Sequence, residues 1–385
     1  MKKIKTKPNL FVVDTPHQML NAVEAVHSFQ LRNNHLLVTR PKGGANDRLA
    51  PLIKAEDWKS VSYPPLWIPP KYSVQKSLNP IASRWYCRCL HFREMHAMAK
   101  VTKKFPEVDK LFLGHYCPRW TPFMRHIANT IKYDALYLMD DGTDTIEVNN
   151  RRREIPDAPR EAYSRPSVWK RIEGSLRARY GKWNLAEASQ VTFFTTYDLD
   201  ITENDHLIKN SYSYLRSLAP VQRVHLADTV VFLGLCSVDD YFEMDMQLDF
   251  LSQAREYFAE KKIMYVAHPR DTASRVTQIR EHLHCQLWPS SSVIEHDLVV
   301  KGIKPKVVAG FVSSALITLA ELMDSDVEIV CFHIAPEHWH HWREDAVGAY
   351  NYIKTKLQHR VTLVPLHPRE RTDAKSGSHE AVAQL

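Results

Sequence analysis

The chain has 385 residues, of which 44% are hydrophobic and 25% are charged, as in a soluble globular protein long enough for two domains. Its formal net charge of +7 suits an anionic substrate or an anionic membrane face, but it is also common without either. No apolar run reaches the roughly 18 to 20 residues that span a bilayer. The short apolar run near the N-terminus is followed by Asp14, which favours a first strand over a signal peptide. Because the six cysteines lack zinc-ligand spacing, we expect reduced thiols in the cytosol.

The first half of the chain alternates short apolar strands with amphipathic helices. Leu10 to Val13 is the first predicted strand, and Thr15 and Pro16 form a helix start, as N-cap and first helical residue. The alternation continues with strands at 36–38, 111–113, 135–139 and 190–196 and helices at 17–31, 79–105, 123–131 and 161–180. This pattern predicts a doubly wound parallel sheet.

The second half repeats the alternation after a stretch with little apolar periodicity, 202–228. We place the domain boundary there, with an N-terminal domain at 1–215, a C-terminal domain at 216–365 and a disordered polar tail at 366–385. The predicted elements are strands at 230–233, 263–267 and 328–332 and helices at 241–260, 272–284, 313–322 and 340–357. The two halves predict an α/β protein with two Rossmann-like domains that face a central cleft.

Candidate catalytic residues follow two of the predicted strands, at the carboxyl ends where open α/β sheets bind ligands. Asp140, Asp141 and Gly142 follow the strand at 135–139, and a carboxylate beside a like charge can act as a general base. The same tripeptide can also be a plain turn closed by glycine. His268 ends the strand at 263–267.

His268 is followed by Pro269 and Arg270, which suggests a phosphate site. The histidine could protonate or hydrogen-bond a departing phosphate, and Arg270 would add positive charge. A histidine whose ring is satisfied by backbone groups is the structural alternative. Both interpretations stay open at the level of sequence.

Ser313 and Ser314 precede an apolar helix and offer a second phosphate-binding feature. Their hydroxyls and the free N–H groups of the first helical turn would form a phosphate cradle. A simple N-cap is the alternative. Glu295 could accept hydrogen bonds from ribose hydroxyls, or could be a surface residue of a helix.

Two short patterns contain residue types that can bind a metal ion. Asp198 and Asp200 form an Asp-x-Asp after a strand-like run, a three-residue match that is frequent by chance. His338, His340 and His341 are too crowded to present three ligands on one helix face. We therefore predict no metal site at either pattern.

The ordered set of motifs resembles the bacterial sialyltransferases. DDGT at 140–143, YVAHPR at 265–270, VIE at 293–295, SSAL at 313–316 and APEHW at 335–339 are similar to motifs of the lipooligosaccharide type, glycosyltransferase family 52. The bacterial polysialyltransferases are relatives of this family. TPHQMLNAVEA at 15–25 is similar to the opening strand–helix unit of the family, and the resemblance extends to about residue 360.

The resemblance implies a GT-B fold with an N-terminal acceptor domain and a C-terminal domain for CMP-sialic acid. It implies inversion at the anomeric carbon without a metal ion or cofactor. Asp141 would be the base and His268 would stabilise or protonate the departing phosphate, while Asp239, after the strand at 230–233, is an alternative base. The other residues carried over bind the donor: Ser313, Ser314 and Arg270 the phosphate, and Glu295 and Gly310 the ribose or base.

The predicted function is transfer of sialic acid to a galactose-terminated bacterial surface glycan, such as lipopolysaccharide or capsule. The predicted location is cytoplasmic, where the basic residues of the predicted helix at 161–180 could touch anionic lipid or simply face solvent. Alternatives are a transferase for another CMP-linked keto-sugar and a non-catalytic nucleotide-sugar or glycan-binding protein. Nucleic-acid binding ranks last, because the charges are dispersed and no binding module is evident.

Overall fold

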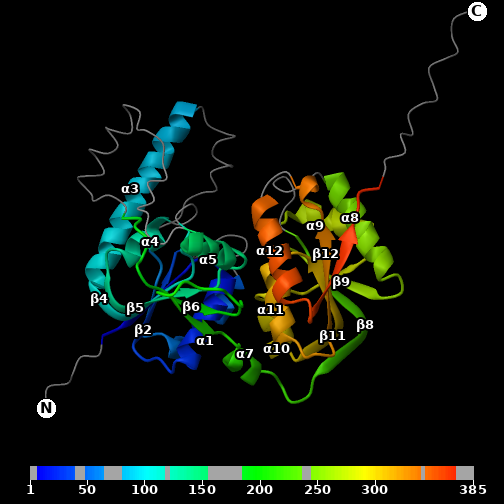
Figure 1. The fold of residues 1–385 in the computed structure, drawn as a ribbon, viewed down its shortest axis with the longest axis horizontal. Helices are drawn as coiled ribbons and strands as arrows, with labels where there is room; N and C mark the ends of the chain where they lie inside the picture. The colour runs from blue at the N-terminus through cyan, green and yellow to red at the C-terminus, as the bar shows by residue number, and fades with distance from the viewer. Residues whose placement is uncertain are drawn as a thin grey trace, which may run out of the picture.

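A computed structural model describes residues 7–39, 48–64, 80–117, 122–154, 184–235, 244–339 and 343–369. Its strands form two sheets, one of seven strands and one of six, and every strand pair in both sheets is parallel. Figure 1 shows the two sheets in two domains that lie side by side. The predicted GT-B class, two Rossmann-like domains, is thereby confirmed.

The N-terminal domain holds the seven-stranded sheet, in the order β3-β2-β1-β4-β5-β6-β7. Its strands are β1 (Asn9–Val13), β2 (Asn34–Val38), β3 (Ser60–Ser62), β4 (Glu107–Leu113), β5 (Lys132–Met139), β6 (Thr192–Thr195) and β7 (His206–Lys209). Its helices are α1 (Pro16–Ser28), α3 (Pro80–Lys104), α4 (Pro122–Ala128) and α5 (Asp144–Glu154), with 3₁₀ turns η2 (Ala50–Leu52) and η3 (Ala55–Asp57). The strand order reverses between β1 and β4, the position where such sheets bind ligands.

The C-terminal domain holds the six-stranded sheet, in the order β10-β9-β8-β11-β12-β13. Its strands are β8 (Val224–Leu233), β9 (Lys262–Val266), β10 (Gln286–Leu287), β11 (Ile303–Phe311), β12 (Glu328–Ile334) and β13 (Val361–Leu366). Its helices are α8 (Met244–Tyr257), α9 (Ala273–Leu283), α10 (Ile294–Val300), α11 (Ser314–Leu322) and α12 (Arg343–Lys356), with the 3₁₀ turn η5 (Pro336–His338). Numbered within the domain, the strand order is 3-2-1-4-5-6, that of dinucleotide-binding folds, and it reverses between β8 and β11.

The central strands are apolar because helices cover both faces of each sheet. All five residues of β1 are buried, and so are the last five of β8 and of β11. Both predicted helix starts are confirmed. Thr15 caps α1 by accepting from Gln18 N, and Ser313 caps α11 by accepting from Leu316 N.

The connection between the domains is anchored on the N-terminal domain. The short helix α7 (Ser213–Ser217) is followed by β8, and its first N–H groups point at Glu24 of α1. Glu24 accepts from Tyr214 N at 2.8 Å and from Leu215 N at 3.0 Å. A buried carboxylate in this position satisfies N–H groups that a helix start leaves free. Helix α7 is therefore fixed to α1 while it also contacts α10 of the other domain.

The sequence prediction differs from the structure mainly at short strands. Strands β3, β7, β10 and β13 and helix α5 were not predicted, and the stretch 202–228 contains β7, α7 and the start of β8. The predicted helix at 161–180 and most of the polar tail lie outside the described residues. Among the helices that the structure describes, none is long and apolar enough to cross a membrane.

Candidate active site at the domain interface

The turn at 140–142 connects β5 to α5 and contains two carboxylates, Asp140 and Asp141, that have different surroundings. Asp140 is fully buried, and its Oδ2 accepts from Thr196 N at 2.7 Å. Burial raises the pKa of Asp140 to about 6, although hydrogen bonds from Thr195 and Thr196 act in the opposite direction. Asp140 therefore faces the interior of its own domain, whereas the side chain of Asp141 is 20% exposed.

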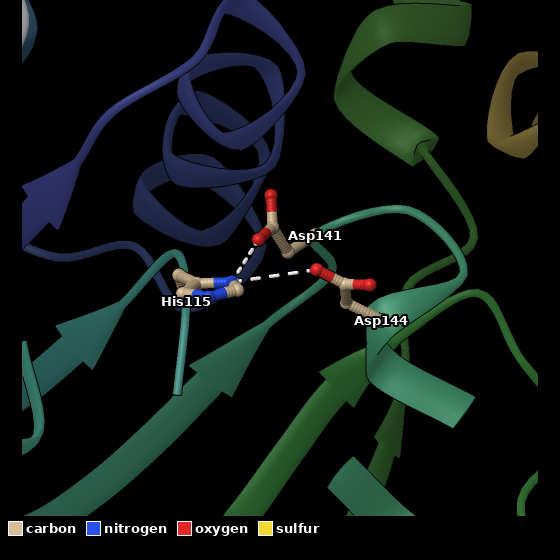
Figure 2. Close-up of side chains that lie close together, drawn as sticks. All are labelled: His115, Asp141 and Asp144. Carbon is tan, nitrogen blue, oxygen red and sulfur yellow. Dashed lines mark ion pairs between the residues drawn. The ribbon is translucent and has the colours of Figure 1, made fainter. Parts of the chain in front are cut away.

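Asp141 is held by one residue of helix α1 and by one residue that follows strand β4. Gln18 of α1 donates from Nε2 to Oδ1 at 2.5 Å, and His115 Nδ1 contacts Oδ2. The same ring nitrogen lies 3.9 Å from Asp144 Oδ2 at the start of α5. Figure 2 shows the imidazole facing both carboxylates. One oxygen of Asp141 is therefore paired with an amide and the other with a ring that can carry charge.

The electrostatics of the pair favour an ionised Asp141. Burial alone raises the pKa of Asp141, but the charge and hydrogen bond of His115, with help from Gln18, lower it below its ordinary value. For His115, burial acts to lower the pKa, and the charges of Asp141 and Asp144 more than offset this and raise it. The folded site therefore stabilises a carboxylate beside an imidazolium.

Sequence reasoning missed His115, although its position follows the rule that identified His268. Gly114 and His115 come directly after the buried end of β4, at the point where the strand order of the first sheet reverses. A Cβ on Gly114 would collide with the side chain of Gln18, so glycine here lets α1 approach the strand end. A histidine after an apolar strand was the available signal.

His115, Asp141 and Asp144 could also hold a cation. Their candidate ligand atoms all lie within 4.8 Å of one another, and one imidazole with two carboxylates suits a divalent transition metal. An ion bound there would occupy Asp141 and leave it unable to accept a proton. A small pocket beside these three is lined by side chains such as Leu138 and Phe193.

The predicted phosphate cradle lies directly against the turn at 140–142. Gly142 has φ +67°, and a Cβ built on it would lie 3.1 Å from Ser314 Cβ and 3.2 Å from Ser314 Oγ. Ser313 Oγ accepts from Leu316 N at 3.2 Å, so Ser313 is an N-cap. The turn after β5 in one domain and the start of α11 in the other are thus brought together.

The surroundings of His268 favour a neutral ring with its proton on one nitrogen. Its Nδ1 accepts from Arg270 N at 3.2 Å, so the ring proton lies on Nε2. Burial, together with the charges of Arg270 and Arg48, lowers the pKa of His268 to about 3. Arg48 belongs to the N-terminal domain, and its carbonyl accepts from Ser292 Oγ at 3.3 Å. His268 is thus a neutral hydrogen-bond donor in positively charged surroundings.

The remaining predicted residues fall in different places. Glu295 is buried, which excludes the surface-residue alternative, and it faces His17 of the other domain. Gly310 lies within β11, where a Cβ would be 2.8 Å from Leu233 O, so glycine permits close strand packing. Arg270 is exposed beside His268. Asp239 lies outside the described residues, so its competition with Asp141 stays a prediction.

The Asp-x-Asp pattern takes part in a contact between domains. Lys356 of α12 lies 3.3 Å from Asp198 Oδ2 and 3.3 Å from Asp200 Oδ1. Asp198 N also donates to Tyr352 Oη at 2.8 Å. His338 packs against Phe250 at a centroid distance of 6.3 Å, and His340 and His341 lie outside the described residues.

The comparisons with known proteins show that this chain is similar in fold to several solved structures. No family model and no curated protein sequence matches the chain. An α-2,3-sialyltransferase from Photobacterium phosphoreum is similar with a TM-score of 0.48 and 12% identity, over 93% of this chain and 99% of that one. The GT-B domain of a sialyltransferase from Photobacterium damselae is similar with a TM-score of 0.43 and 12% identity, over 92% of this chain and 99% of that one. A UDP-glucosyltransferase from Polygonum tinctorium is similar with a TM-score of 0.47 and 9% identity, over 93% of this chain and 85% of that one.

These likenesses are too distant to argue an activity. A sialyltransferase and a UDP-glucosyltransferase have nearly the same TM-score with this chain. The resemblance of the motifs to glycosyltransferase family 52 stays a prediction, because no family model matches. The residues at the domain interface must therefore indicate which reaction the protein performs.

Proposed function

We propose that the protein is an inverting glycosyltransferase that moves sialic acid from CMP-sialic acid to a hydroxyl of a bacterial surface glycan. The observation that carries the proposal is the contact between Gly142 and Ser314. It supports the proposal because the turn that contains Asp141 in one domain lies against the capped start of α11 in the other. A transferase needs both, since it must remove a proton from the acceptor and stabilise a departing phosphate.

Asp141 is the proposed base. The acceptor oxygen attacks the anomeric carbon on the face opposite to the phosphate, and its proton passes to Asp141. The bond from the anomeric carbon to the phosphate oxygen breaks, and its electron pair leaves with CMP. Gln18 and His115 hold the carboxylate in place, which supports a single orientation during the transfer.

The phosphate is proposed to lie at the start of α11, near Ser313 and Ser314. The free N–H groups of the first helical turn and the Ser314 hydroxyl would face the growing negative charge. His268 would donate a hydrogen bond from Nε2, because Nδ1 is occupied by Arg270 N. The charges of Arg48 and Arg270 would favour the anion further.

Glu295 is proposed to bind the ribose, and the pocket beside His115 is proposed to receive part of the acceptor. Catalysis is proposed to need no metal ion, since the helix start, His268 and the two arginines supply the positive field that a metal would provide. A cytoplasmic location is proposed because CMP-sugars are made there.

Two alternative functions would use the same nucleotide site. A different CMP-linked keto-sugar would use the same phosphate and base residues, because none of the contacts described identifies the sugar. A non-catalytic binding protein would need the same nucleotide site but no ionised base, and the lowered pKa of Asp141 speaks against it.

Product analysis tests the proposal. The protein is incubated with CMP-sialic acid and a panel of galactose-terminated glycans, and the products are examined by mass spectrometry and by NMR at the anomeric carbon. We expect sialic acid to be added with inverted configuration at its anomeric carbon. A protein that binds CMP but forms no product would support the binding-protein alternative, and a protein that does not bind CMP would contradict the proposal.

A further inference from the structure

Glu295 contacts a histidine that approaches from the opposite domain. His17 is the second residue of α1 and Glu295 the second residue of α10. His17 Nδ1 lies 3.6 Å from Glu295 Oε1, with side chains 16% and 3% exposed. His17 Nε2 is buried and has no hydrogen-bond partner among the described residues. The pair therefore joins the two domains through a poorly hydrated contact.

The charges around His17 come from both domains. Burial alone lowers the pKa of His17, but Glu295, Asp140 and Asp141 act together to raise it above its ordinary value. Three carboxylates close to one interface would repel one another, and the repulsion is stronger where water is excluded. A charged His17 beside these carboxylates reduces this repulsion and gives the buried Glu295 side chain a partner of opposite charge.

We propose that His17 is a positioning residue for the donor nucleotide and that it holds the Glu295 carboxylate in the orientation that accepts hydrogen bonds from the ribose hydroxyls. The proposal rests on the proposed function, because it takes Glu295 as the ribose residue. Each carboxylate oxygen has two acceptor positions, so the contact with His17 leaves acceptor positions of Glu295 for a ribose diol. His17 would thus make the site selective for a ribonucleotide without touching the nucleotide.

Titration calorimetry with CMP and 2′-deoxy-CMP tests the proposal on the full chain. In His17→Ala we expect CMP to bind about tenfold more weakly, while the affinity for 2′-deoxy-CMP stays the same. The reason is that His17 acts only through a hydroxyl that the deoxynucleotide lacks. Equal losses for the two nucleotides, or no loss for either, would overturn the proposal.

A matched control lies on the same helix. His27 Nε2 is 3.0 Å from Asp57 Oδ1, a histidine–carboxylate contact confined to the N-terminal domain. We expect His27→Ala to bind CMP as the wild type does, and an equal loss in this variant would contradict a specific role for His17. In a Glu295→Gln background, His17→Ala should cause no further loss of CMP affinity. An additional loss there would show that His17 acts by another route.

Two precautions keep the outcome decisive. Thermal unfolding is recorded for every variant, and His17→Asn replaces His17→Ala if the latter does not fold. We expect His17→Asn to lose the same selectivity, because an uncharged amide cannot offset the carboxylates. Failure of the wild type to bind CMP would overturn the proposed function itself. A wild type that binds CMP and 2′-deoxy-CMP equally would overturn only the ribose role and, with it, the role of His17.

Discussion

His115 Nδ1 contacts the carboxylate of Asp141, and the two residues come from the ends of neighbouring strands in the first sheet. The contact accounts for the charge on a half-buried carboxylate. Burial favours the neutral acid, yet the imidazolium keeps the pKa of Asp141 below its ordinary value. Because of this contact, we expect Asp141 to be ionised throughout the physiological pH range and available as a base.

The first prediction concerns the acid limb of the pH–rate profile. Asp141 must be ionised to accept a proton, so the rate falls as pH drops through its pKa. In His115→Gln the burial of Asp141 is no longer opposed by the charge of His115, so the pKa of Asp141 rises and the acid limb moves to higher pH, by about one unit or more. The measurement is kcat/KM against pH. If the acid limb of His115→Gln stays where it is in the wild type, the role of His115 is contradicted. The control is His206→Gln, because His206 is an exposed histidine on β7.

The second prediction concerns the protonation of His268. Its pKa of about 3 means that the ring stays neutral in the free protein well below pH 6. NMR of the imidazole nitrogens, assigned with His268→Asn, should show an Nε2–H tautomer from pH 7.5 to pH 5. Bound CMP should raise this pKa, since its phosphate offsets the charges of Arg48 and Arg270. A titration midpoint near 6.5 in the free protein would contradict the neutral state of the ring.

The third prediction compares two glycines. Gly142→Ala places a side chain at φ +67° and against Ser314, so we expect a loss of about 1 to 2 kcal/mol of stability and a rate at least tenfold lower. Gly348→Ala, in α12, meets no atom within 4 Å and should leave the rate unchanged. The measurements are chemical denaturation and the rate of CMP release. Equal effects of the two substitutions would argue against a special role for the turn at 140–142.

The fourth prediction separates a domain contact from a metal site. Asp198→Asn together with Asp200→Asn removes the ion pairs to Lys356, which are exposed and worth at most about 1 kcal/mol each. We therefore expect near-normal turnover and no change in its response to divalent ions. A loss of turnover that added Mn²⁺ partly restores would indicate a metal role for this pair.

The sequence was sufficient for the fold because its long buried strands have a clear pattern. Strand β1 is apolar from Leu10 to Val13 and β8 from Val230 to Leu233, and Thr15 and Ser313 mark helix starts by their own chemistry. The missed strand β10 has two exposed residues, and pairing with β9 determines it more than its own sequence does.

The site was predictable only in its separate parts. Asp141, His268 and Ser313 each follow a strand, which local sequence can indicate. The contacts from His115 and from His17 depend on which strands are neighbours and on how the domains meet. No local pattern contains that information, and the same holds for the ion pairs of Lys356.

The central claim is that Asp141 is the base of a metal-independent sialyl transfer. The most direct test is the rate of acceptor-dependent CMP release from CMP-sialic acid in EDTA, for the wild type, Asp141→Asn and Asp239→Asn. We predict full turnover of the wild type, a loss of about 100- to 10,000-fold in Asp141→Asn with unchanged CMP binding, and little change in Asp239→Asn. The claim would be contradicted if Asp141→Asn is active while Asp239→Asn is inactive. It would also be contradicted if EDTA abolishes the turnover of the wild type.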